Sequence, residues 1–128
     1  MSLTAPRNTR EAIGDTISVT ANASIYAGAM VALNASGHAV PAAVSSGYTV
    51  VGRAENTVTS GGILTVRRGA FLYDNYTSAA VSASDIGKTV YVHDDASVQA
   101  FNATSGAVNI AAGKLLGFAE GQAIVEIR

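Results

Sequence analysis

The segment YVHDD, residues 91–95, gathers the side chains best suited to metal binding or acid–base chemistry. His93 stands beside Asp94 and Asp95, and imidazole and carboxylate serve both purposes. A closed metal site needs three or four converging ligands, whereas neighbouring residues of a strand point to opposite faces. His38, the only other histidine, is distant in the sequence. We therefore interpret 91–95 as a strand that ends in an Asp-Asp turn, and we predict no metal site.

Other motifs of catalysis are incomplete. GKT at 87–89 resembles the end of a phosphate-binding loop, but the first glycine of that motif would fall at Ser82, and a strand is expected to follow instead of a helix. Neither the G-x-S-x-G nor the G-x-G-x-x-G motif occurs. The adjacent carboxylates Asp94 and Asp95 lie in a turn, whereas a glycosidase needs two that face each other across a cleft. We expect no catalytic residues, no cofactor and no enzymatic activity.

Two neighbouring arginines interrupt the segment LTVRRGAFLYDN, residues 64–75, which otherwise alternates like a β-strand. Because successive strand residues point to opposite faces, Arg67 and Arg68 do not both face water if one face is core. The large apolar residues change parity after Gly69, which predicts a glycine β-bulge there. Glu55, on an adjacent expected strand, is a candidate partner for these arginines. We predict that at least one arginine is buried against another subunit or protein; a solvated pair is the alternative.

The charge content of the chain is low. Only 13% of the 128 residues are charged, with a net charge of −1 and 48% hydrophobic residues, whereas an average domain is about one-quarter charged. No basic stripe of the kind that binds nucleic acid is present, and no segment approaches the roughly 20 apolar residues of a membrane span. We therefore expect the chain to bind neither nucleic acid nor a membrane. We interpret the weakly ionic surface as one covered by other protein. The alternative is a monomer kept in solution by uncharged polar residues.

Short apolar–polar alternations separated by glycine-bearing turns run through most of the chain. The expected strands are 15–20, 29–33, 48–55, 62–68, 71–74, 88–94, 97–101, 113–118 and 123–128. A single helical turn is expected at 82–87, ended by Gly87. This pattern predicts an all-β fold, a single small β-sandwich or barrel, with a jelly-roll among the options. Residues 1–14 lack the alternation, so we expect an extended N-terminal arm at 1–14 and a single β domain at 15–128.

Four segments, in this order, resemble a known family. They are IYAGAMVALNASGHAVPA (25–42), VVGRAENTV (50–58), LTVRRGAFLYDN (64–75) and SDIGKTVYVHDDASV (84–98). Together with the closing GFAEGQAIVEIR (117–128), they resemble the small capsid cement, or head decoration, proteins of tailed bacteriophages and prophages. The short SGG link at 60–62 departs from the family's pattern, in which a longer and more acidic insertion is common.

The resemblance implies a structural role on the virion. Copies of the chain would bind the outer surface of an assembled, expanded capsid and bridge neighbouring capsomers. The implied partners are the major capsid protein and further copies of the chain, with a trimer favoured over a dimer. The protein would be made in the bacterial host cytoplasm and would then be located on the outer surface of the capsid. The candidate contacts to capsid or subunits are Arg7, Arg10 and Glu11 of the arm, together with Arg67 and Arg68.

A glycan-binding or adhesin module of a phage fibre or bacterial surface is the competing interpretation. Such modules present exposed aromatic rings on which sugars stack, and this chain contains no tryptophan. Tyr73 and Tyr76, near the DNYT turn, are the one platform that the sequence offers.

Overall fold

Ten strands and two single-turn 3-10 helices make up the described part of the chain, Ala5 and residues 15–128, in a computed structural model. The strands are β1 (Thr16–Thr20), β2 (Met30–Leu33), β3 (Ala39–Pro41), β4 (Thr49–Ala54), β5 (Ile63–Arg67), β6 (Gly69–Asn75), β7 (Thr89–Val92), β8 (Ser97–Gln99), β9 (Ala111–Ala119) and β10 (Gln122–Ile127). The helical turns are η1 (Thr77–Ala79) and η2 (Ala83–Asp85). The predicted all-β fold is confirmed, and no helix within these residues is long and apolar enough to span a membrane. Arg7, Arg10 and Glu11 of the expected arm lie outside the described residues.

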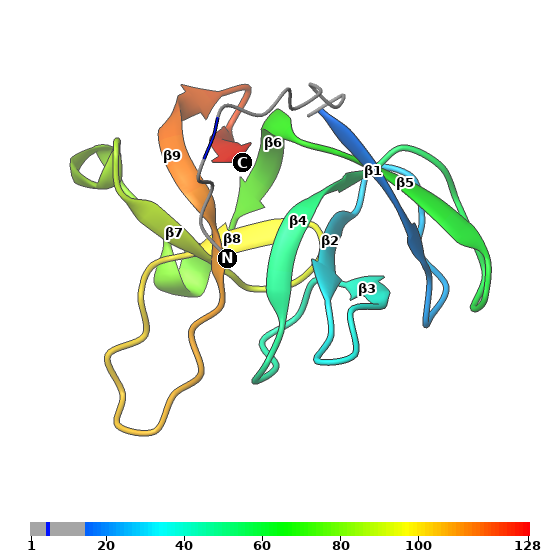
Figure 1. The fold of residues 1–128 in the computed structure, drawn as a ribbon. Helices are drawn as coiled ribbons and strands as arrows, with labels where there is room; N and C mark the ends of the chain where they lie inside the picture. The colour runs from blue at the N-terminus through cyan, green and yellow to red at the C-terminus, as the bar shows by residue number, and fades with distance from the viewer. Residues whose placement is uncertain (1–4, 6–14) are drawn as a thin grey trace.

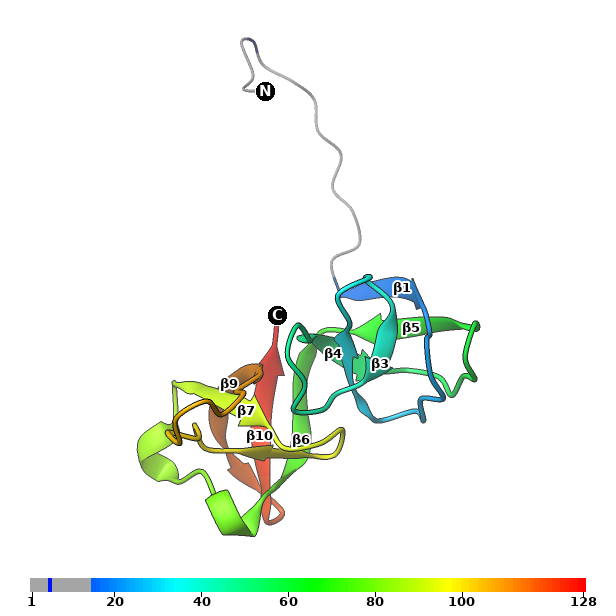
Figure 2. The same cartoon turned by 90° about the horizontal axis from the view of Figure 1, so that it is seen from below.

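The strands form two sheets that lie side by side (Figure 1). The first has the order β1-β5-β4-β2-β3, and all its pairings are antiparallel. The second closes into a barrel of order β10-β6-β8-β7-β9, in which β6 and β8 run parallel. The view from below shows the same division, with β6 leading from the first sheet into the barrel (Figure 2). The predicted barrel is thus one of two β units in the fold.

Strand β2 connects the two hydrophobic cores. Met30 and Ala32 pack into the barrel core, whereas Val31 between them packs into the core of the first sheet. Because side chains alternate along a strand, β2 is buried on both faces, which explains its continuous apolar sequence. The first core also contains Ala21, Ile25, Ala39, Ala54, Leu64 and Val66, and the barrel core is built mainly on Tyr73, Val90, Val92, Val98, Leu115 and Val125. The sheet and the barrel therefore share a packed boundary at β2.

The helical turn predicted at 82–87 is present as η2. The Ser82 N–H donates to Oδ2 of Asp85 at 2.9 Å, and the Asp85 N–H donates to the Ser82 carbonyl at 2.9 Å. Gly87 follows with φ +86° and ends the helical turn. Glycine adopts this left-handed conformation at little cost because it has no Cβ.

Candidate functional site

Glu55 is the centre of an ion-pair cluster on the first sheet. Its Oε1 accepts hydrogen bonds from Nη2 of Arg53 at 3.0 Å and from Nε of Arg67 at 2.8 Å. The register of β4 and β5 sets Arg53 directly opposite Arg67, so both guanidinium groups reach the same carboxylate. The hydrogen bond from Arg53 is the main reason that the pKa of Glu55 lies below its ordinary value, although burial opposes it. Arg67 therefore pairs with the carboxylate that the sequence offered as its partner.

Neither arginine of the Arg67–Arg68 pair is buried within the chain. The side chain of Arg67 is 50% exposed, and Arg68 is exposed as well. Arg68 is held through its backbone, since its N–H donates to the carbonyl of Asp15 at 2.7 Å. Its side chain forms no ion pair with any residue of the described chain. That either arginine is buried against a neighbouring subunit or a capsid stays a prediction.

Arg53 is the arginine of this cluster that sequence reasoning did not single out. Its guanidinium lies 4.4 Å from the centre of the Phe71 ring, so it connects β4 of the sheet to β6 of the barrel. Its Nε is buried and, like the buried hydroxyl of Tyr73, has no hydrogen-bond partner among the described residues. Burial raises the pKa of Tyr73, and the charge of Arg53 opposes this effect. Arg53 and Glu55 are the only charged residues in 16–66, which is the signal that marks them in the sequence.

Gly69 lies where the chain passes from the sheet to the barrel. Strand β5 ends at Arg67, and Gly69 begins β6 with φ +152°. Val66 faces the first core and Tyr73 faces the barrel core. The buried side chains therefore change from even-numbered to odd-numbered positions between these residues. The register shifts in the described ladders lie instead in the β2–β4, β7–β9 and β9–β10 pairings. The change of face at Gly69 therefore comes from the change of sheet and not from a bulge within one ladder.

A second polar cluster closes the turn between β7 and β8, beside a hollow of about 400 Å³. Nδ1 of His93 lies 2.9 Å from Oγ of Ser97, and this hydroxyl donates to Oδ1 of Asp94 at 2.7 Å. Oδ2 of Asp94 also lies 3.4 Å from Nδ1 of His93. A catalytic triad needs the serine and the aspartate at opposite ring nitrogens, whereas both approach Nδ1 here. The hydrogen bonds of this cluster hold the turn that the sequence predicts.

The two carboxylates of this turn differ in their surroundings. Burial disfavours the charged form of Asp94, but hydrogen bonds from Ser97 and from the Ala96 N–H outweigh it, so the pKa of Asp94 lies below its usual value. Burial and the neighbouring charge of Asp94 raise the pKa of Asp95. Within the described ranges, no three His, Asp or Glu side chains converge as a metal site would require.

The two tyrosines that the competing, glycan-binding interpretation depends on are separated. Tyr73 is only 3% exposed and belongs to the barrel core. Tyr76 stacks on His93, with the ring centres 3.6 Å apart and the planes inclined by 12°. The two rings therefore present no common surface to a glycan.

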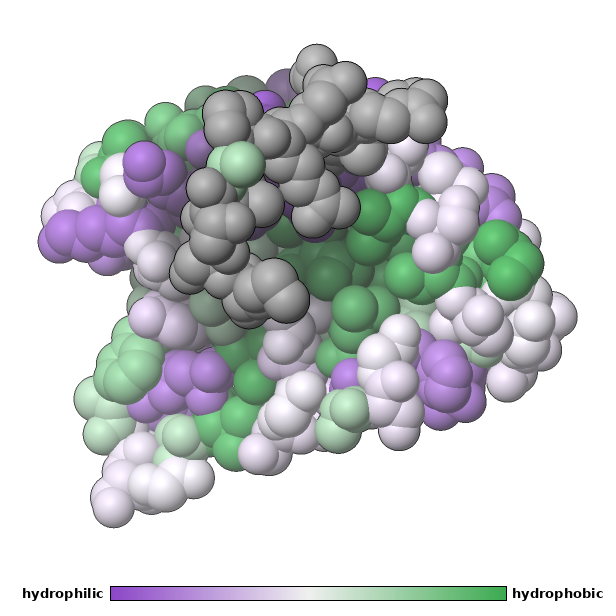
Figure 3. All heavy atoms as spheres, in the orientation of Figure 1, coloured by the Kyte–Doolittle hydropathy of each residue, from purple (hydrophilic) through white to green (hydrophobic). Residues whose placement is uncertain are grey.

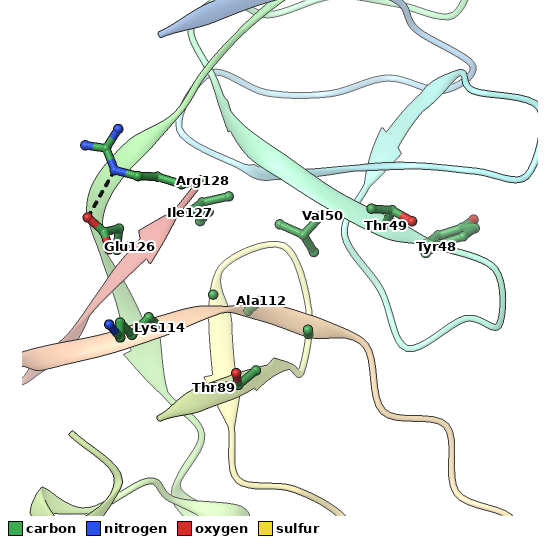
Figure 4. A pocket seen from close by; sticks show the side chains of 11 residues that line it. Tyr48, Thr49, Val50, Thr89, Ala112, Lys114, Glu126, Ile127 and Arg128 are labelled. Carbon is green, nitrogen blue, oxygen red and sulfur yellow. Dashed lines mark hydrogen bonds and ion pairs between the residues drawn. The ribbon is translucent and has the colours of Figure 1, made fainter. Parts of the chain in front are cut away.

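An open groove of about 480 Å³ runs between the sheet and the barrel (Figure 4). Val50 of β4 and Ile127 of β10 lie on its two sides. Glu126 and Arg128 form an ion pair at 3.1 Å on its rim, whereas Lys114 has no ion pair with a described residue. The hydropathy surface shows hydrophobic residues gathered around the hollow between the two units (Figure 3). The groove thus combines apolar side chains with three charged groups, those of Lys114, Glu126 and Arg128.

The charges are divided unevenly along the chain, with Arg67 and Arg68 between a nearly uncharged stretch and a more charged one. We call residues 16–66 the neutral half, because its only charged residues, Arg53 and Glu55, bind each other. The barrel half, 69–128, carries the carboxylates Asp74, Asp85, Asp94, Asp95, Glu120 and Glu126 against the cations Lys88, Lys114 and Arg128. Large hydrophobic side chains are exposed in both halves, among them Tyr26 and Ile63 in the neutral half and Phe101 and Phe118 in the barrel half. Residues 16–66 are therefore the part of the chain with the fewest charges per residue.

Comparison of the chain with protein-family models, with curated proteins and with solved structures finds no match.

Proposed function

We propose that the chain is a structural protein of a bacteriophage virion, which binds the outer surface of the assembled, expanded capsid and bridges neighbouring capsomers. The observation that carries this proposal is the neutral half. Its exterior exposes Tyr26 and Ile63 and contains no unpaired charge. Desolvating a charged group is costly, so a surface of this kind favours burial against other protein. The resemblance to capsid cement proteins supports a capsid as the partner.

The uneven charge suggests how the chain is oriented on the shell. The neutral half is the docking side, and the barrel half, with its excess of carboxylates, faces water. Arg67 and Arg68 lie at the end of the neutral half, where they can reach acidic groups of the major capsid protein or of a neighbouring copy. The contacts would be mostly apolar and main-chain in character, with the arginines at the rim.

Binding only to the assembled lattice is sufficient for a stabilising role. A ligand with no affinity for the disassembled subunits shifts the equilibrium toward the shell by mass action. An oligomer that contacts several capsid subunits at once gains further affinity from effective concentration, so each single contact can be weak.

Two matched variants test the docking side. Ile63→Asp places a carboxylate in the neutral half, where Ile63 is 62% exposed, and Ile86→Asp makes the same change in the barrel half, where Ile86 is 47% exposed. Both sites are exposed, so both variants are expected to fold, as circular dichroism will show. Co-sedimentation with expanded empty heads of the cognate capsid protein should reveal at least about tenfold weaker binding for Ile63→Asp, since about 1.4 kcal/mol corresponds to a factor of ten. Equal binding of the two variants would refute the proposed orientation.

The expected N-terminal arm contributes a separate contact to the proposal. We predict that deletion of residues 2–12, which removes Arg7, Arg10 and Glu11, lowers the occupancy of expanded heads in the same assay. Unchanged occupancy would exclude the arm as a capsid contact and leave the docking role of the neutral half standing.

A further inference from the structure

Strand β1 is an edge strand with one side open. It pairs with β5 over its whole length, from Thr16 opposite Arg67 to Thr20 opposite Ile63, without a register shift. In the described chain, β5 is the only strand that forms a ladder with β1. Among the described residues, its far side meets protein only beyond its end, where Ala21 bridges Ala39 of β3. No strand of Ala5 and 15–128 pairs with the rest of this edge.

The hydrogen bonds show which backbone groups point to the open side. The Arg68 N–H donates to the Asp15 carbonyl, and the Ala21 N–H donates to the Gly62 carbonyl. Because hydrogen-bonded and non-hydrogen-bonded pairs alternate in an antiparallel ladder, Ile17 and Val19 also bond to β5. The intervening Thr16 and Ser18 therefore direct both N–H and C=O away from β5.

This edge lacks the features that protect edge strands from further pairing. The sequence TISVT contains no charged residue, no proline and no bulge. The opposite edge strand, β3, is three residues long and ends in Pro41, which has no N–H to donate. Ile17 and Val19 lie against the first core but are only partly buried. A neighbouring strand would complete both their hydrophobic cover and the hydrogen bonds of the edge.

We propose that β1 pairs with β1 of a second copy of the chain, antiparallel about a two-fold axis at Ile17. Thr16 of each copy then lies opposite Ser18 of the other, and both residues exchange N–H and C=O hydrogen bonds. Strand β1 carries no charge of its own. The carboxylate of Asp15, which precedes it, lies opposite Val19 of the copy and not opposite a second carboxylate. Thr–Ser and Ile–Ile are favourable cross-strand pairs. The contact is isologous, so it closes at a dimer rather than at the trimer that the resemblance favours.

The pairing is a property of the free chain and does not rest on capsid binding, so its test needs no capsid. Ser18→Pro removes the outward N–H but no hydrogen bond to β5, and proline is tolerated at such an edge position. Ser18→Ala keeps the N–H and is the matched control. In sedimentation experiments over increasing protein concentration, the natural chain and Ser18→Ala should dimerise, and Ser18→Pro should remain monomeric with an unchanged circular dichroism spectrum.

A cross-link locates the two-fold axis without relying on proline. The chain has no cysteine, so Ile17→Cys introduces a single thiol at the proposed axis. Opposed Cα atoms in a non-hydrogen-bonded pair lie about 4.5 Å apart, within disulfide range. Oxidation should link Ile17→Cys into a dimer, and should leave Thr65→Cys, on the interior strand β5, monomeric. A monomeric or trimeric natural chain, a dimer of Ser18→Pro, or equal cross-linking of the two cysteine variants would overturn the proposal.

Discussion

Arg53 and Arg67 bind the same carboxylate oxygen, yet they should contribute very differently to stability. Arg53→Ala removes the hydrogen bond to Glu55 and also the contact with Phe71, which joins the sheet to the barrel. Arg67→Ala removes only a hydrogen bond to Glu55 from a half-exposed side chain. The two substitutions therefore compare a contact across the two units with a surface ion pair within one sheet.

The magnitudes follow from these contacts. A partly exposed cation–π contact contributes about 0.5–1 kcal/mol, and an exposed ion pair contributes about 0.2–1 kcal/mol. With the packing of its aliphatic stem, which is also lost, Arg53→Ala should lower the free energy of unfolding by about 2 kcal/mol. Arg67→Ala should lower it by less than about 1 kcal/mol. At about 4 °C per kcal/mol for a chain of this size, the expected decreases in Tm are about 8 °C and at most about 4 °C.

Urea unfolding followed by circular dichroism measures both changes, and a double-mutant cycle with Phe71→Leu isolates the aromatic contact. We expect a coupling energy of about 0.5–1 kcal/mol between Arg53 and Phe71, and none between Arg67 and Phe71. If Arg67→Ala proved as destabilising as Arg53→Ala, or if the cycle gave no coupling for Arg53, the assignment of Arg53 as the link between sheet and barrel would be refuted.

Three further predictions concern packing, pH and assembly. Gly113→Ala should destabilise the fold by about 2 kcal/mol, because a Cβ there collides with the Glu126 carbonyl, whereas Gly117→Ala on the same strand has open space and should be nearly neutral in thermal unfolding. The pKa of Glu55 is lowered in the folded state. The ionised carboxylate therefore stabilises the fold at pH values above its unfolded pKa, and this stabilisation is lost as the pH falls through its folded pKa. Glu55→Gln should flatten the pH dependence of Tm in that acidic range. Arg68→Ala should weaken assembly more than Lys114→Ala, and equal retention of oligomer by both in light scattering would count against burial of Arg68 between subunits.

The class of the fold was predictable from the sequence because alternation and glycine-bearing turns are local signals. β3, the strand that the alternation did not predict, has three residues and ends in Pro41, so it carries too little pattern to be detected. The division into a sheet and a barrel was not predictable, since it depends on which strands pair across long separations. β2 illustrates the difficulty: its residues serve two cores, and a short apolar run does not show on how many faces it is buried.

The cluster around Glu55 was predictable in part. Glu55 and Arg67 lie on strands that were expected to be neighbours, so their pairing could be anticipated from charge alone. The role of Arg53 could not, because Phe71 belongs to the other sheet and meets Arg53 only after the chain passes through Gly69. The sequence correctly predicted that the buried side chains change from even to odd positions near Gly69. A bulge within one ladder and a strand that leaves its sheet produce the same sequence pattern, so the pattern did not distinguish them.

The proposed capsid binding can be tested most directly by titrating expanded and unexpanded empty heads with the purified chain and counting the copies that co-sediment. We predict that binding to expanded heads saturates at a fixed number of copies per capsid subunit, and that the decorated heads dissociate at a higher temperature than bare ones. Unexpanded heads should bind few copies. Absence of saturable binding to expanded heads, or binding that leaves their dissociation temperature unchanged, would contradict the proposed function.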